Sequence, residues 1–238
     1  MSDVILEARD VHKVYGGVRA LNGLSLSIRQ GEIHCVVGPN GAGKSTFFKT
    51  LIGVERPTTG QIIYKGEDVT RLPAFRRARR GLSVKFQNIS LFAELTGLQN
   101  LFVPLRRNHP KSEIPARAAA VLARVGLAGT EDLPVRYLSH GQQQWLSIGL
   151  SIAADPDLLL LDEPAAGLSV EETARTADLI RHLNASGMTV IVIEHDMGFI
   201  RSLRARTSVL HYGRLFAQGE FDEIAANEEV RRIYLGAA

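Results

Sequence analysis

Gly38-Pro39-Asn40-Gly41-Ala42-Gly43-Lys44-Ser45-Thr46 decides the fold, because it fills every fixed position of the phosphate-binding pattern G-x-x-x-x-G-K-[ST]. It follows an apolar, strand-like run at 33–37 and opens a helix-like run at 45–51, the context that the pattern requires. Its glycines let backbone N–H groups face phosphate oxygens, and the new helix adds the positive end of its dipole. We expect all nine residues to bind a nucleotide, with Lys44 at the β- and γ-phosphates and Ser45 at Mg²⁺.

The composition is that of an ordinary globular protein. The 238 residues are 45% hydrophobic and 22% charged, which excludes disordered and fibrous classes. The longest apolar stretches, at 145–154 and 158–161, are much shorter than the roughly 20 residues needed to cross a bilayer. Met1-Ser2-Asp3-Val4 does not begin a secretory signal, and the single Cys35 cannot form an internal disulfide. These features favour a cytosolic protein.

The charge pattern gives little reason to expect a nucleic-acid partner. The net charge is +3, and positive and negative residues alternate along most of the chain. One basic cluster stands out, consisting of Arg71, Arg76, Arg77, Arg79 and Arg80. It has no interleaved aromatic residues that could stack on bases, so we expect a solvated helix face. A surface for a protein partner stays open as an alternative.

The hydrophobic pattern predicts an α/β fold with a mostly parallel sheet. We predict strands at 4–8, 24–28, 33–37, 61–64, 82–86, 158–161, 189–193, 208–210 and 215–217. We predict helices at 45–51, 73–80, 114–125 and 170–185, and a short one ending near 234. Strand signals are absent from 95 to 154. We therefore expect one domain over 1–238, with an α/β core at 1–94 and 155–238 that includes an N-terminal antiparallel β subdomain, and an inserted helical subdomain at 95–154.

The four leucines at 158–161 end in Asp162 and Glu163, which is typical of a Walker B strand. A buried strand would deliver both carboxylates to its carboxyl end, where Asp162 could hold Mg²⁺. Glu163 could accept a proton from an attacking water. Alone, the same pattern could be a strand that ends in two solvated acids; the P-loop makes the Walker B interpretation the stronger one.

A third motif, Leu138-Ser139-His140-Gly141-Gln142, resembles the LSGGQ signature of ATP-binding cassette (ABC) ATPases and precedes the Walker B strand as it does in that family. Ser139 and Gln142 also form a capping box, so the motif could simply begin a helix. The resemblance to ABC ATPases covers nearly the whole chain. It implies an ATPase that binds ATP and Mg²⁺, with Ser139, Gly141 and Gln142 completing the nucleotide site of a second subunit.

The resemblance implies roles for three more residues. Tyr15 corresponds to the aromatic residue that stacks on adenine, although it could be an ordinary strand aromatic. Gln87 corresponds to the glutamine that contacts Mg²⁺ or the attacking water, and His195 to the histidine that contacts the γ-phosphate. The sequence departs from the family at His140, which replaces a glycine, and at Ser169, which replaces an aspartate. Both departures bear on the interface between the two subunits.

The phrases at 86–92, 138–142 and 194–197 resemble ATPases of branched-chain amino acid importers, and His140 favours their urea- and amide-importing relatives. This implies a homodimer or heterodimer at the cytoplasmic face of the membrane. It also implies integral permease subunits and, indirectly, a solute-binding protein. Two alternatives are the ATPase of a lipopolysaccharide exporter and a soluble ABC ATPase acting in DNA repair or translation. A P-loop kinase would lack the signature and the histidine.

Overall fold

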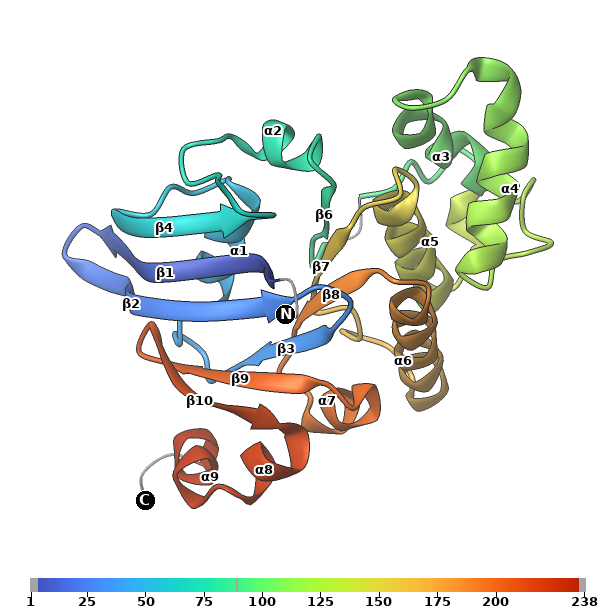
Figure 1. Ribbon diagram of the computed structural model, residues 1–238. Coiled ribbons are helices and arrows are strands. Elements are labelled where there is room, and N and C mark those ends of the chain that lie inside the picture. The colour runs from blue at the N-terminus through green and yellow to red at the C-terminus, as the bar shows by residue number, and fades with distance from the viewer. Residues whose placement is uncertain (1–3, 89, 236–238) are drawn as a thin grey trace.

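The computed structural model describes residues 4–88 and 90–235 and contains two β-sheets (Figure 1). The strands are β1 (Val4–Tyr15), β2 (Val18–Arg29), β3 (Ile33–Val37), β4 (Thr59–Tyr64), β5 (Glu67–Asp68), β6 (Leu82–Lys85), β7 (Leu158–Asp162), β8 (Thr189–Ile193), β9 (Arg206–His211) and β10 (Arg214–Glu220). Ile89, within the phrase at 86–92, lies outside the described residues, as do 1–3 and 236–238.

The described helices cover the sheets and fill the stretch between β6 and β7. They are α1 (Lys44–Ile52), α2 (Ala74–Ala78), α3 (Gly97–Arg106), α4 (Ile114–Arg124), α5 (His140–Ile152), α6 (Val170–Ala185), α7 (Met197–Leu203), α8 (Phe221–Ala226) and α9 (Glu228–Leu235). Two short 3₁₀ helices, η1 (Lys111–Glu113) and η2 (Val135–Tyr137), join them. The prediction missed α7 and α8, which are too short to show a helical period.

The larger sheet has the order β10-β9-β3-β8-β7-β6. Strands β9, β3, β8, β7 and β6 are parallel neighbours, and β10 adds an antiparallel edge. The predicted mostly parallel sheet is therefore confirmed. Because the carboxyl ends of β3, β7 and β8 meet at one edge, the loops that follow these three strands lie next to one another.

The smaller sheet is antiparallel, has the order β2-β1-β4-β5 and packs on α1. Phe47, Phe48 and Leu51 of α1 are buried with apolar residues from both sheets, so α1 lies between the two layers. The opposite face of the larger sheet is covered by α5 and α6 (Figure 1). The P-loop helix is thus fixed inside the core, while its N-terminus reaches the edge of the parallel sheet.

The predicted insertion is helical in the structure. Helices α3, α4 and α5 occupy it, and they form one side of the molecule in Figure 1. Within the described residues its only β contact is an isolated bridge between Thr96 and Pro134. Apolar residues of α4, such as Ala118 and Leu122, join the core on the α5 side of the sheet. The boundaries 95 and 154 of a separate subdomain remain a prediction.

The expectation of a solvated arginine face is wrong for Arg77, which is fully buried. Its guanidinium donates to the carbonyl oxygens of Thr50 (2.8 Å) and Leu51 (2.6 Å) in the last turn of α1. Burial lowers the pKa of Arg77 to about 10. A cation at a helix C-terminus satisfies carbonyl groups that have no partner inside the helix. The other four arginines of the cluster are exposed, as expected.

Candidate functional site

The P-loop connects β3 to α1 and has the backbone that its glycines permit. Gly43, the residue before α1, has φ +100°, and no side chain of the described residues caps the helix. Gly38 has φ +153°, and a Cβ there would lie 2.4 Å from the backbone oxygen of Leu210. These positions exclude a side chain, so the loop presents backbone N–H groups and the positive end of α1.

Lys44 is the first residue of α1 and lies over the loop. Its Nζ donates to the carbonyl oxygens of Gly38 (2.6 Å) and Pro39 (3.1 Å). Burial lowers the pKa of Lys44, while the charges of Glu163 and Asp162 oppose that shift. The loop therefore combines an ammonium group with unshielded amides, which suits a polyphosphate.

Asp162 ends β7, and Glu163 starts the loop that follows. The backbone of Glu163 is left-handed, with φ +45°, which a residue with a side chain rarely adopts. Its N–H donates to the carbonyl oxygen of Ile193 at 2.9 Å, which ties the loop to the end of β8. Burial and the charge of Glu163 raise the pKa of Asp162. A strained backbone of this kind is typical of a functional position.

Two predicted residues, Gln87 and His195, meet at the carboxylate of Glu163. Gln87 Nε2 donates to Glu163 Oε2 at 2.7 Å, and His195 Nδ1 lies 3.5 Å from Glu163 Oε1. Gln87 follows β6 and His195 follows β8, the strands on either side of β7. Both groups can orient a water molecule beside Glu163, which is the arrangement that base-assisted hydrolysis needs.

Glu194 was not predicted as a site residue, although it directly follows the apolar strand at 189–193. It is 1% exposed and accepts the N–H groups of Ala165 (3.1 Å) and His195 (3.0 Å). Burial raises the pKa of Glu194, and the backbone hydrogen bonds partly offset this effect. The buried carboxylate fixes the loop after β7 against the loop after β8, and thereby holds Glu163 close to His195.

The signature forms the N-terminus of α5, and the predicted capping box is present. Ser139 Oγ accepts the Gln142 N–H at 3.2 Å, and Gln142 Oε1 accepts the Ser139 N–H at 2.9 Å. Ser169 and Glu172 form a second capping box, at the start of α6. His140 Nε2 lies 3.4 Å from the carbonyl oxygen of Ala166, in the loop after Glu163.

A hollow of about 370 Å³ brings together residues 40–46 of the P-loop, Asp162 and Glu163, but not Gly38 or Pro39. It is lined by Val18, Arg19, Ala20, Asn40, Gly41, Ala42, Gly43, Lys44, Ser45, Thr46, Gln87, Asp162, Glu163 and Ile193. Tyr15, Ser139 and His195 are not among these residues. Tyr15 is 41% exposed at the end of β1, and burial together with the charge of Glu55 raises its pKa.

The ABC transporter family matches this sequence over residues 21–166. This range includes the P-loop, the signature and the Walker B strand. The chain belongs to the ABC transporter family. The chain is therefore an ABC ATPase, and the predicted fold class and family are confirmed.

Curated relatives and solved structures agree with this assignment. The chain is 36% identical to LivG of Salmonella typhimurium, the high-affinity branched-chain amino acid transport ATP-binding protein, over 100% of both chains. It is 38% identical to the methionine import ATP-binding protein MetN of Caulobacter vibrioides, over 94% of this chain and 70% of MetN. It also resembles a dimeric ATP-binding cassette bound to ADP and Pi, with a TM-score of 0.81, 26% identity and coverage of 91% and 98%.

The residues of this ABC ATPase suit Mg²⁺ held together with a nucleotide. No group of three or more His, Cys, Asp or Glu within residues 4–88 and 90–235 could hold a metal alone. Mg²⁺ usually keeps several waters and takes one or two carboxylates plus phosphate oxygens. Ser45 and Asp162 line the same hollow as Lys44, so a hydroxyl and a carboxylate are available beside the phosphate cradle.

Lys85 lies behind this site, at the end of β6 and two residues before Gln87. It is 1% exposed, and none of the described residues accepts a hydrogen bond from its Nζ. Burial lowers its pKa to about 8, and the charge of Asp162 is the main opposing influence. The ABC site thus has an internal cation close to its carboxylates, which the sequence did not single out.

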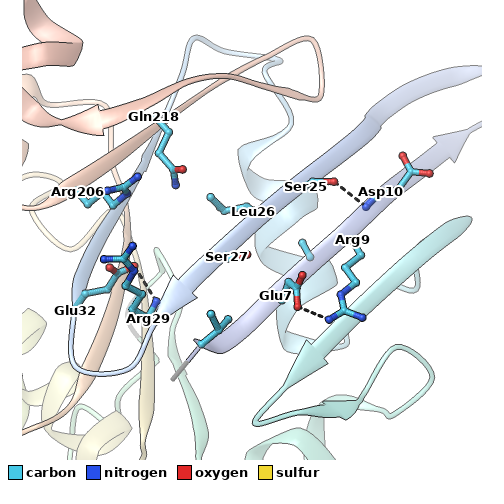
Figure 2. Close-up of a pocket in the computed structure, with 12 residues that line it drawn as sticks. Glu7, Arg9, Asp10, Ser25, Leu26, Ser27, Arg29, Glu32, Arg206 and Gln218 are labelled. Atoms are coloured by element: carbon cyan, nitrogen blue, oxygen red, sulfur yellow. Dashed lines mark hydrogen bonds and ion pairs between the residues drawn. The ribbon is translucent and has the colours of Figure 1, made fainter. Parts of the chain in front are cut away.

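A larger hollow, of about 610 Å³, is lined by residues of β1, β2, β9 and β10 and shares no residue with the nucleotide hollow (Figure 2). Acidic and basic side chains share its walls, including Glu7, Glu32, Arg29 and Arg206. Figure 2 shows the ion pair between Arg9 and Glu7, which are 2.7 Å apart. This larger hollow is lined by no residue of the P-loop or the Walker B strand.

Across the described part of the chain, no helix has the length and apolar character needed to span a bilayer.

Proposed function

We propose that this ABC ATPase powers amino acid import, most specifically of branched-chain amino acids, as one half of an ATP-binding dimer. The convergence of Gln87 and His195 on Glu163 carries the catalytic part of the proposal. The full-length likeness to LivG supports the substrate class, since MetN has about the same identity but is considerably longer. These relatives favour import over the two alternatives, a lipopolysaccharide exporter and a soluble ABC ATPase.

In the proposed reaction, the P-loop amides and Lys44 bind the β- and γ-phosphates of ATP, and Tyr15 contacts adenine. Ser45, Asp162 and Gln87 would hold Mg²⁺, which neutralises charge that develops on the phosphates. Glu163 accepts a proton from water at its carboxylate, while Gln87 and His195 orient that water. Because the groups are already placed by β6, β7 and β8, positioning and electrostatics supply most of the catalysis.

The signature residues act on the nucleotide of a second subunit in this proposal. Ser139, Gly141 and Gln142 lie at the N-terminus of α5, outside the hollow that holds the P-loop of the same chain. A related cassette has a dimeric structure with ADP and Pi. We propose a head-to-tail homodimer or heterodimer in which each signature completes the other subunit's γ-phosphate site.

We propose that α3 and α4 bind an integral permease subunit, which places the chain at the cytoplasmic face of the membrane. An apolar hollow of about 490 Å³ is lined there by Leu95, Leu98, Gln99, Phe102, Val103, Lys111, Ile114 and Pro115. Val103 is 71% exposed and nearby Phe92 is 66% exposed.

Phe92 lies in the loop after Gln87, and its N–H donates a hydrogen bond to Asn100 of α3. The surface therefore joins the catalytic glutamine loop to α3. A solute-binding protein would act indirectly, through the permease.

Transport and the docking surface can be tested together. Deleting the gene should abolish uptake of labelled leucine, and a copy encoding Val103→Glu should fail to restore it. The same variant should retain ATPase activity in the isolated protein, because Val103 lies outside the nucleotide hollow. Uptake of leucine that survives deletion, or loss of urea uptake instead, would contradict the amino acid assignment. The urea and amide prediction from His140 remains a second candidate for the substrate.

A further inference from the structure

The hydroxyl of Ser139 already has an acceptor within its own chain. Ser139 Oγ donates to Glu172 Oε1 at 3.2 Å and accepts the N–H of Gln142. A serine hydroxyl carries a single hydrogen. The contact with Glu172 therefore uses the only hydrogen that Ser139 can offer to a phosphate.

The Glu172 carboxylate also lies against the backbone of Gly141. A Cβ on Gly141 would stand 2.3 Å from Glu172 Oε1 and 2.5 Å from its carboxyl carbon. Hydrogen bonds, first from the Ser169 N–H and also from the signature residues, lower the pKa of Glu172. An anion thus occupies the positive end of α5, where the proposed dimer would place the partner's γ-phosphate.

Buried contacts fix the backbone of Glu172, which keeps its side chain within reach of the signature. Trp145 Nε1 of α5 donates to Thr176 Oγ1 of α6 at 3.0 Å, and both residues are buried. The Thr176 hydroxyl in turn donates to the carbonyl oxygen of Glu172 at 2.8 Å. This chain of contacts holds the first turn of α6 beside the first turn of α5.

We infer that Glu172 is an intramolecular competitor of the γ-phosphate for the signature, an inference that rests on the proposed function. Its carboxylate accepts the Ser139 hydrogen and fills the space beside Gly141 until a partner's nucleotide displaces it. A nucleoside triphosphate can replace both interactions with its γ-phosphate oxygens. A nucleoside diphosphate lacks that group and leaves the Ser139–Glu172 contact in place. The contact therefore opposes closure of the dimer and makes closure more selective for ATP.

The test compares ATP-dependent dimerisation of three proteins that all carry Glu163→Gln, which slows hydrolysis. The first has no other change, the second adds Glu172→Gln and the third adds Glu171→Gln. Glutamine keeps the capping box with Ser169, so Glu172→Gln should fold normally, which thermal unfolding checks. Glu171→Gln removes the same charge one residue away and is the matched control. Dimers are measured by analytical ultracentrifugation across a titration of Mg-ATP.

The ATP concentration at half-maximal dimerisation should fall about five-fold or more in the Glu172→Gln protein, because an opposing charged hydrogen bond is lost. Glu171→Gln should leave it unchanged. An unchanged or higher midpoint with Glu172→Gln would overturn the inference while the dimer itself stands. Failure of the Glu163→Gln protein to dimerise in ATP would instead refute the proposed function.

Discussion

The N-terminus of α1 and the N-terminus of α5 are both proposed to bind phosphate, yet they are built differently. Gly43 precedes α1, no side chain of the described residues caps that helix, and its first residue is the cation Lys44. Ser139 caps α5, and the Glu172 carboxylate lies against Gly141. The first terminus has no side-chain cap and carries a positive charge, whereas side chains of the same chain already bond to the second.

This difference follows from where each terminus finds its nucleotide. In the proposed function, the P-loop binds phosphate within its own chain, so its donors can be exposed to one ligand at all times. The signature would meet phosphate only in the proposed dimer, and Ser139 and His140 are exposed in the single chain. A terminus that satisfies its own groups is stable in the separate subunit and requires a specific ligand to open it.

The largest expected effect separates binding at the P-loop from the chemistry beside it. Glu163→Gln removes the proposed base and should lower ATP turnover roughly 10²–10⁴-fold. Binding of a fluorescent ATP analogue should stay within about two-fold of the parent protein, because Lys44 and the loop amides are unchanged. Phosphate release and analogue titration measure the two quantities. Unchanged turnover would show that Glu163 is not the base.

A second prediction concerns the charge near each terminus. The half-buried anion Glu172 lies beside α5, and the buried cation Lys85 lies behind the P-loop site. Burial lowers the pKa of Lys85 from an ordinary 10.5 to about 8. Between these pH values the unfolded chain binds more protons than the folded one, so this residue makes stability rise with pH. Well below pH 8, Lys85 is protonated in both the folded and the unfolded chain, so its contribution to the unfolding free energy no longer changes with pH.

Urea unfolding of the parent and of Lys85→Met at several pH values isolates this contribution. The unfolding free energy of the parent minus that of Lys85→Met should increase by roughly 3 kcal/mol from pH 8 to 10.5. Other lysines and tyrosines titrate in the same range, but they do so in both proteins and cancel. A difference that is flat over this range would mean that Lys85 is not buried as a cation.

One substitution at each terminus tests the proposed division of roles directly. Lys44→Ala should weaken ATP binding by the separate subunit about 10–100-fold, the usual loss for a charged hydrogen bond to phosphate. Ser139→Ala should leave that binding unchanged but lower turnover, because its hydroxyl serves the partner's nucleotide. Calorimetry on the monomer measures ATP binding by each variant, and ATPase assays at high protein concentration measure its turnover. If Ser139→Ala weakened binding in the monomer, the division of roles would be wrong.

The smallest effect compares the glycines of the two motifs. Gly38→Ala should destabilise the fold by about 1–3 kcal/mol, because its Cβ would collide with the backbone oxygen of Leu210. Gly141→Ala should cost less than about 1 kcal/mol, since Gly141 is helical and its Cβ meets only the movable end of Glu172. Thermal unfolding of both variants gives the order, and a reversed order would contradict the assigned contacts.

Short motifs and strong periodicity were sufficient to predict most of the fold, the P-loop and the two carboxylates after the strand at 158–161, whereas Gln87 and His195 were expected only from the family resemblance. The P-loop and the capping boxes are local, so their residues alone specify their backbone, and α6 spans the residues that its apolar spacing predicts. Contacts that depend on tertiary packing were not predictable. Nothing local distinguishes Arg77 from Arg76, and only the packing of α2 against α1 buries one of them. The contact of Glu172 with Ser139 likewise exists only because α6 packs beside α5.

The buried guanidinium of Arg77 has a mechanical consequence. It fastens the last turn of α1 to α2, and Gly81 then leads directly into β6, which ends just before Gln87. The opposite end of the same helix holds the phosphate cradle. Helix α1, the Arg77 hydrogen bonds and β6 thus connect the phosphate-binding turn to Gln87, which lies beside the surface proposed for the permease. We therefore expect a displacement of one to move the other.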